Sequence, residues 1–104
     1  MTHAGLHPFL SDSAGLARAT TLFRENGLRT MLLHLKPGEE IPEHQTPGAI
    51  TVHCLQGEAS FLSADERVEL RPTLLISLAP GMPHSVVAQQ DTLLLVTVSE
   101  QIRA

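Results

Sequence analysis

The 104-residue sequence has no tryptophan, no tyrosine and only three phenylalanines, although 42% of its residues are hydrophobic. Leucine, valine, isoleucine and alanine must therefore fill the interior. Cys54 is the only cysteine, which excludes an internal disulfide and a cysteine-based zinc site. Buried lone cysteines are commonly small hydrophobic residues, so a structural role for Cys54 is favoured over a catalytic thiol.

Basic residues are also scarce. Seven lysines and arginines stand against eleven aspartates and glutamates, the formal net charge is −4, and no basic run occurs. Neither nucleic acid nor an anionic membrane is therefore expected as a partner. No apolar stretch reaches the ~18 residues of a membrane-spanning helix, and the first residues lack the basic and apolar segments of a signal peptide. We expect a cytoplasmic protein with one domain over residues 1–104, including an N-terminal segment at 1–15.

Helical periodicity is absent outside, at most, the first fifteen residues, and short apolar runs bounded by turn residues recur instead. Asn26-Gly27, between "LARATTLFR" and "LRTMLLHLK", predicts a hairpin. Gly57 separates "AITVHCLQ" from "EASFLS" and predicts a sharp bend or bulge in one continuous ribbon. With the later runs, the pattern predicts about eight to ten short strands.

Many short strands without helices must bury one face and protect their edges. A closed barrel or a double-sheet jelly roll does both. The runs "TLLISL" and "TLLLVTVS" are almost continuously apolar, so we expect the barrel interior to cover one face and a neighbouring subunit the other. The sequence thus predicts an all-β jelly-roll barrel that forms a homodimer.

Two segments resemble the paired motifs of the cupin family. The first follows the motif spacing at Gly38, His44, Thr46, Ile50 and Gly57. The second follows it at Thr73, Ala79, Gly81, His84 and Ala88. The pieces "KPGEEIPEH", "LQGEA" and "LAPGMPHSV" are the most similar, and the resemblance covers residues 28–99. It implies a small single-domain cupin with a jelly-roll β-barrel.

In that family the first motif typically supplies two histidines and a glutamate, and the second supplies one more histidine. Together they hold a divalent metal, often iron, manganese, nickel or zinc. The resemblance places His44 at the first histidine and His84 at the last. Thr46 takes the position of the second histidine and Ile50 that of the glutamate, so half of the ligand set is missing. Two imidazoles alone make a weak metal site.

His53 is the remaining candidate for a third metal ligand. Side chains alternate along a strand, so Ile50 and Val52 share one face while His53 lies on the other. Ile50 holds the family's inward position, which predicts that Ile50, Val52 and Thr46 line the pocket. A bulge at Pro47-Gly48 would reverse the faces and turn His53 inward. The outer face is favoured for His53, with the inward position kept as an alternative.

Two functions from different classes fit these residues. The first is a metal-dependent enzyme that acts on a small molecule in the barrel mouth, with His44 and His84 as metal ligands. The family that the chain resembles includes dioxygenases, isomerases, lyases and decarboxylases, and the resemblance does not select one of these reactions. The second is a non-catalytic, sensor-like module that binds a small molecule without metal, using His44, Thr46 and His84 as polar groups in an apolar pocket. Metal binding is slightly preferred, and both stay open.

Overall fold

The computed structural model describes residues 1–6 and 18–100, which form nine strands and no helix. No helix that could span a membrane occurs within these ranges. In chain order the strands are β1 (Ala19–Glu25), β2 (Leu28–Leu35), β3 (Glu40–His44), β4 (Ile50–Gln56), β5 (Ala59–Ser63), β6 (Glu66–Leu70), β7 (Leu75–Leu78), β8 (His84–Ala88) and β9 (Thr92–Ser99).

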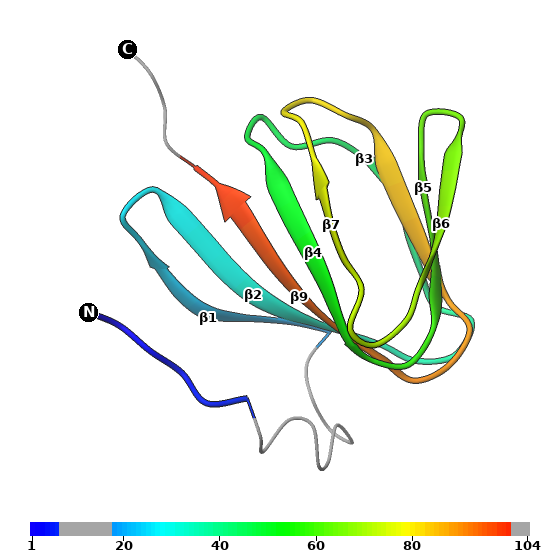
Figure 1. Cartoon of the computed structure of the whole chain (residues 1–104), viewed down its shortest axis with the longest axis horizontal. Helices are drawn as coiled ribbons and strands as arrows, with labels where there is room; N and C mark the ends of the chain where they lie inside the picture. Colours follow the sequence, from blue (N-terminus) through cyan, green and yellow to red (C-terminus); the bar gives the residue numbers. More distant parts are fainter. Residues whose placement is uncertain (7–17, 101–104) are drawn as a thin grey trace.

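The strands form two antiparallel sheets that face each other (Figure 1). One sheet has five strands in the order β1-β2-β9-β4-β7, and the other has four in the order β3-β8-β5-β6. Strands that are distant in sequence, such as β2 and β9, therefore lie side by side. The predicted all-β jelly-roll barrel is confirmed.

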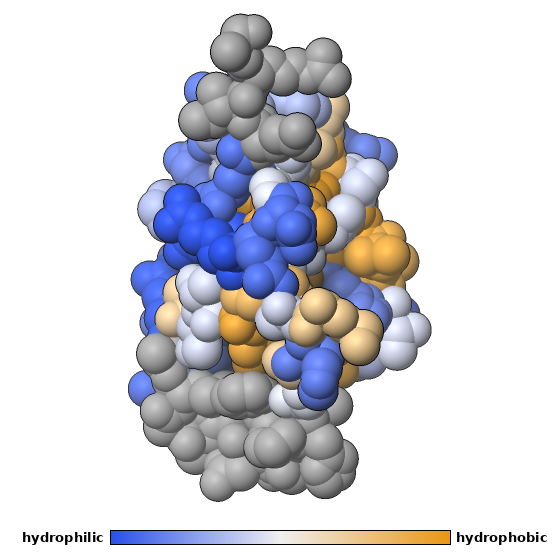
Figure 2. Space-filling view, turned by 90° about the vertical axis from the view of Figure 1, so that its left-hand side faces the viewer, coloured by the Kyte–Doolittle hydropathy of each residue, from blue (hydrophilic) through white to orange (hydrophobic). Residues whose placement is uncertain are grey.

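The predicted hairpin at Asn26-Gly27 joins β1 to β2. Both residues have positive φ angles, 57° and 76°, as a two-residue turn of the primed type requires. The hairpin leaves β1 as an edge strand, where the charged side chains of Arg24 and Glu25 are exposed. Seen from the β1 side, much of the surface is hydrophilic (Figure 2). Charge on an edge strand discourages pairing with another chain.

At Gly57 the chain leaves one sheet and enters the other. β4 belongs to the five-stranded sheet and β5 to the four-stranded sheet, so the expectation of one continuous ribbon is wrong, although the sharp bend is present. Gly57 has a φ of 88°, and a Cβ there would overlap the backbone of Asp91 and Thr92. Only glycine fits this crossing without strain.

Aliphatic side chains fill the space between the sheets, as the composition requires. Ile50, Val52 and Cys54 project inward from β4, and Phe61 is the one aromatic residue of the described core. Leu35, Leu70, Ala59 and Ala88 close one end of the barrel with almost no exposed surface. Burial raises the pKa of the Cys54 thiol, which donates a weak hydrogen bond to the Gln56 carbonyl at 3.5 Å. The thiol is thus held protonated, as befits a packing role.

Candidate functional site

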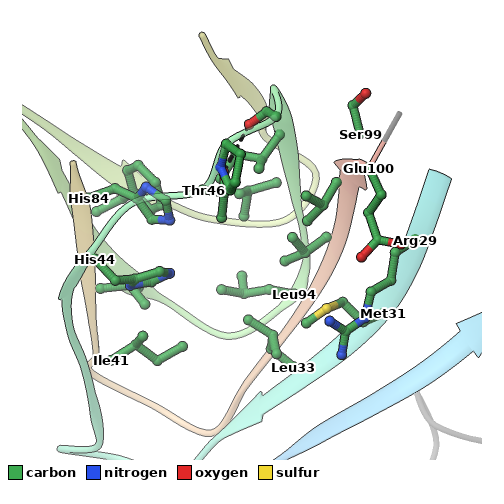
Figure 3. Close-up of a pocket in the computed structure, with 18 of the residues that line it drawn as sticks. Arg29, Met31, Leu33, Ile41, His44, Thr46, His84, Leu94, Ser99 and Glu100 are labelled. Atoms are coloured by element: carbon green, nitrogen blue, oxygen red, sulfur yellow. Dashed lines mark hydrogen bonds between the residues drawn. The ribbon is translucent and has the colours of Figure 1, made fainter. Parts of the chain in front are cut away.

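A cavity of about 690 Å³ lies between the two sheets at the end opposite the closed core. Its walls are the inward residues of β2, β9 and β4 on one side and of β3, β5 and β8 on the other. Most of these residues are aliphatic. The polar exceptions gather around His44 and His84 on one wall and around Arg29 on the other (Figure 3). A cavity of this size and lining is typical of small-molecule sites.

His44 and His84 are directly paired in register where β3 ends and β8 begins. Their ring centroids are 4.2 Å apart and the ring planes meet at 63°. His84 is buried, with 6% of its surface exposed, whereas His44 is open to solvent. The two histidines expected from the motifs therefore do meet at the barrel mouth.

An irregularity in β3 gives His44 its inward direction. Ile41 pairs with Val86 and His44 pairs with His84, so β3 uses one residue more than β8 between the same two pairs. In a regular strand Ile41 and His44 would face opposite sides, because three positions reverse the alternation. The extra residue restores a common face, and both side chains line the cavity. Pro42, which has no N–H to offer, lies within this irregularity.

Backbone carbonyls select the tautomer of both imidazoles. Nδ1 of His44 lies 2.9 Å from the Pro42 carbonyl oxygen, and Nδ1 of His84 lies 3.0 Å from that of Met82. A carbonyl only accepts, so Nδ1 carries the proton in each neutral ring and Nε2 keeps its lone pair. Within residues 1–6 and 18–100, neither Nε2 has a hydrogen-bond partner.

Phe61 supports the His84 ring from within the barrel. Their rings stack with centroids 5.7 Å apart and planes at 11°. The Nδ1 bond and the stack together leave His84 little freedom to rotate. A fixed ring with a free Nε2 is the form in which histidine binds metals.

Thr46, Ile50 and Val52 line the cavity. The Thr46 hydroxyl donates to the Gly48 carbonyl at 2.9 Å, so its proton is committed to the loop between β3 and β4. Ile50 and Val52 are almost fully buried, with 4% and 3% exposed. Thr46 stands at the position of the family's second histidine and Ile50 at that of its glutamate, and neither side chain is a strong metal donor.

His53 lies on the other face of β4, away from His44 and His84. It pairs with Leu75 of β7 and Leu95 of β9 across the outer surface of the sheet. The β4 bulge falls between Cys54 and Gln56, beyond His53, rather than at Pro47-Gly48. The structure therefore does not bring this candidate third ligand to the pair.

The donor set decides which metal site the protein can form. Across the described ranges, no three His, Cys, Asp or Glu side chains are grouped so as to hold a metal ion. The residues present fit a site with two imidazole ligands and not the four-ligand set of the family. Water or a bound molecule would have to complete the coordination.

Three charged residues of the cavity were missed by the sequence reasoning. Arg24, Arg29 and Glu100 all line it at the open end. Arg29 could have been found, because it alternates with Met31 and Leu33 on the inward face of β2. Arg24 lies near the end of β1, and Glu100 follows the last residue of β9. At such positions the alternation of side chains along a strand does not predict which way a side chain points.

A two-sheet jelly roll with a histidine-lined mouth defines a cupin-type barrel. Residues 31–99 match the family model described as a cupin domain. This match spans more than half of the chain, which therefore belongs to the cupin-domain family. No curated protein matches significantly.

Solved structures agree with this fold. A cupin superfamily protein from Desulfitobacterium hafniense is 19% identical with a TM-score of 0.76, the match covering 80% of this chain and 76% of that one. A protein of unknown function from Streptococcus pyogenes is 26% identical, with a TM-score of 0.74 and coverage of 82% and 75%. KdgF from Halomonas sp. is 17% identical, with a TM-score of 0.73 and coverage of 81% and 78%.

Proposed function

We propose that this cupin binds a divalent transition metal through Nε2 of His44 and His84, next to a small molecule held in the cavity. The free Nε2 atoms of two adjacent, backbone-anchored imidazoles carry this proposal. Iron, manganese, nickel and zinc all accept imidazole ligands. When bound, the ion would supply Lewis-acid chemistry at the barrel mouth.

The protein's own residues would orient the ligands and exclude water. The Pro42 and Met82 carbonyls hold the two rings in the required tautomer. Phe61 supports His84, and the aliphatic walls provide a dry surface for the body of a small molecule. With two protein ligands, the ion would keep positions open for water or for the bound molecule.

Calorimetric titration of untagged, chelator-treated protein with Zn²⁺, Ni²⁺ or Mn²⁺ tests the proposal. We expect one ion per chain, lost in both His44→Ala and His84→Ala. His53→Ala is the matched control, since it removes an imidazole from the outer face of the same barrel and should leave binding unchanged. Binding that survives His84→Ala, or that disappears equally in His53→Ala, would contradict the proposal.

A non-catalytic binding module without metal is the second candidate. The lack of a third donor near the pair, within the described ranges, favours it. The single carboxylate among the lining residues, Glu100, is bonded to Arg24, so no free carboxylate is available there as a general base. Binding of a small molecule that is unaffected by excess chelator would select this candidate over the metal-dependent one.

The homodimer and the cytoplasmic location are also proposals. On the outer face of the five-stranded sheet, His53 lies between Leu75 and Leu95, and Leu75 is 61% exposed. An exposed leucine beside half-buried apolar neighbours supports contact with a second copy of the chain. The cytoplasmic location rests on the sequence alone.

A further inference from the structure

Register places Arg29 at the open end of the cavity, on the wall opposite the histidines. Arg29 pairs with Val98 of β9, and Val98 pairs with Ile50 of β4, so the three form one row across the sheet. The next row inward, at Met31, is entirely apolar. In Figure 3 the Arg29 side chain lies beside Met31, across the cavity from His44 and His84. The site therefore has polar groups at its mouth and an apolar floor.

The charge balance of the lining leaves one cation unmatched. Arg24 and Glu100 neutralise each other through two contacts, at 2.6 Å and 3.0 Å. The Arg29 guanidinium reaches only the Thr21 hydroxyl, at 3.4 Å, and forms no ion pair with an acidic residue in the part of the chain that is described. The cavity thus carries a net positive charge within a protein whose formal charge is −4.

Two further features favour an anion in this cavity. Ile50 stands where the family's glutamate would be, so the histidine pair is not accompanied by a negative charge. A guanidinium that borders an apolar cavity also gains more from an anionic partner than one in bulk water, because its surroundings have a lower dielectric constant. Its planar fork matches the two oxygens of a carboxylate.

We propose that the cavity selects small monocarboxylates with an aliphatic or aromatic body. Arg29 binds the carboxylate at the mouth, and the body packs on Val52, Leu94 and Val96. The apolar walls offer few hydrogen-bond partners to a sugar or another polyol, so such ligands would lose more hydration than they regain. This inference rests on the proposed small-molecule function of the barrel, but not on metal binding.

Calorimetry with 4-phenylbutyrate and its neutral analogue 4-phenylbutanamide, both in excess chelator, tests the proposal. We expect the carboxylate to bind at least roughly tenfold more tightly than the amide, as a charge-assisted hydrogen bond provides. Arg29→Gln should remove this preference while amide binding persists, and Arg29→Lys should restore part of it. Arg67→Gln is the matched control, because it makes the same charge change at an exposed arginine paired with Glu69.

The outcomes separate this inference from the metal proposal. Equal preference for the carboxylate in wild type and Arg29→Gln, both with native circular dichroism, overturns the inference, as does failure of 4-phenylbutyrate to bind wild type. A preference that appears only when the chelator is omitted, and that is lost in His84→Ala, also overturns it while leaving the metal proposal standing. Arg29-dependent binding in a protein that takes up no metal supports the inference and defeats the metal proposal.

Discussion

Ile41 and His44 line the same cavity although they lie three positions apart on one strand. The register shift in β3 makes this possible by inserting one residue opposite β8. The histidine pair therefore depends on backbone geometry as much as on residue identity. The same geometry fixes Nδ1 of His44 on the Pro42 carbonyl, two residues back along the irregular strand.

Restoring a carboxylate at position 50 should strengthen the metal site. Ile50 lines the cavity and is 96% buried, so Ile50→Glu introduces an acidic oxygen into the same space as His44 and His84. We expect the affinity for Zn²⁺ or Mn²⁺ to rise on the order of tenfold or more, because ligand charge sets affinity. Without metal the variant should be less stable, since the buried charge lacks a partner.

Val52→Glu is the control for this gain, because Val52 is one row deeper on the same face of β4. It should lose stability similarly without gaining metal affinity. Thermal melts with and without metal, together with calorimetry, distinguish the two variants. An equal gain in both would show that any buried carboxylate suffices and that position 50 has no special relation to the histidines.

A methyl group at the sheet crossing should be far more damaging than one at another left-handed glycine. Gly57→Ala combines a φ of 88° with overlap between the new Cβ and the backbone of Asp91 and Thr92. We expect its free energy of unfolding to fall by more than about 3 kcal/mol. Gly38→Ala has a similar φ of 84° but open space around the Cβ, so only the conformational cost of about 1–2 kcal/mol should appear.

Urea denaturation of both glycine variants measures the difference. If the two lose the same stability, the close approach at Gly57 is relieved by a small backbone shift, and positive φ alone explains the loss at both turns. A clearly larger loss in Gly57→Ala would instead identify the crossing between sheets as the sensitive point.

The regular parts of the strands were predictable from the sequence. β4 runs without irregularity from Ile50 to Cys54, so alternation put Ile50 and Val52 on one face, and the family position of Ile50 marked that face as the one that lines the cavity. Asn26-Gly27 also carries its turn geometry in its residue types, since both must adopt positive φ. In such places local rules suffice because no tertiary contact overrides them.

The parts that were missed depend on partners distant in sequence. That Gly57 joins two sheets follows from which strands pair with β4 and β5, and nothing in the adjacent residues specifies those pairings. The charge neutralisation of Arg24 by Glu100 spans 76 positions. The direction of His44 follows from a register shift against β8, and alternation alone would misplace it.

Cys54 should react slowly with thiol reagents at mildly alkaline pH. Burial raises the pKa of its thiol, so the folded protein keeps it protonated where an unfolded chain begins to ionise. The raised pKa also makes stability fall as pH rises above about 8.5, the ordinary value for cysteine, because the unfolded state then gains by losing the proton. Cys54→Ala should flatten that alkaline decline.

The measurement is labelling with a disulfide reagent at pH 8. We expect a rate on the order of a hundredfold or more below that of the urea-unfolded chain, since the barrel must open first. A rate close to the unfolded one would mean that the thiol is reached in the folded state, and would revive a reactive role for Cys54.

Replacing Leu75 should dissociate the proposed dimer. Leu75 is 61% exposed on the outer face of the five-stranded sheet, and a stable interface needs roughly 1,200 Å² of mostly well-packed surface. Leu75→Asp places a charge in that contact, so light scattering should report twice the chain mass for wild type and the single chain mass for the variant. Leu62→Asp is the control, because Leu62 is 39% exposed on the other sheet. A monomeric wild type, or dissociation by Leu62→Asp alone, would remove this face as the interface, since a contact through β4 and β7 requires dissociation by Leu75→Asp and not by Leu62→Asp.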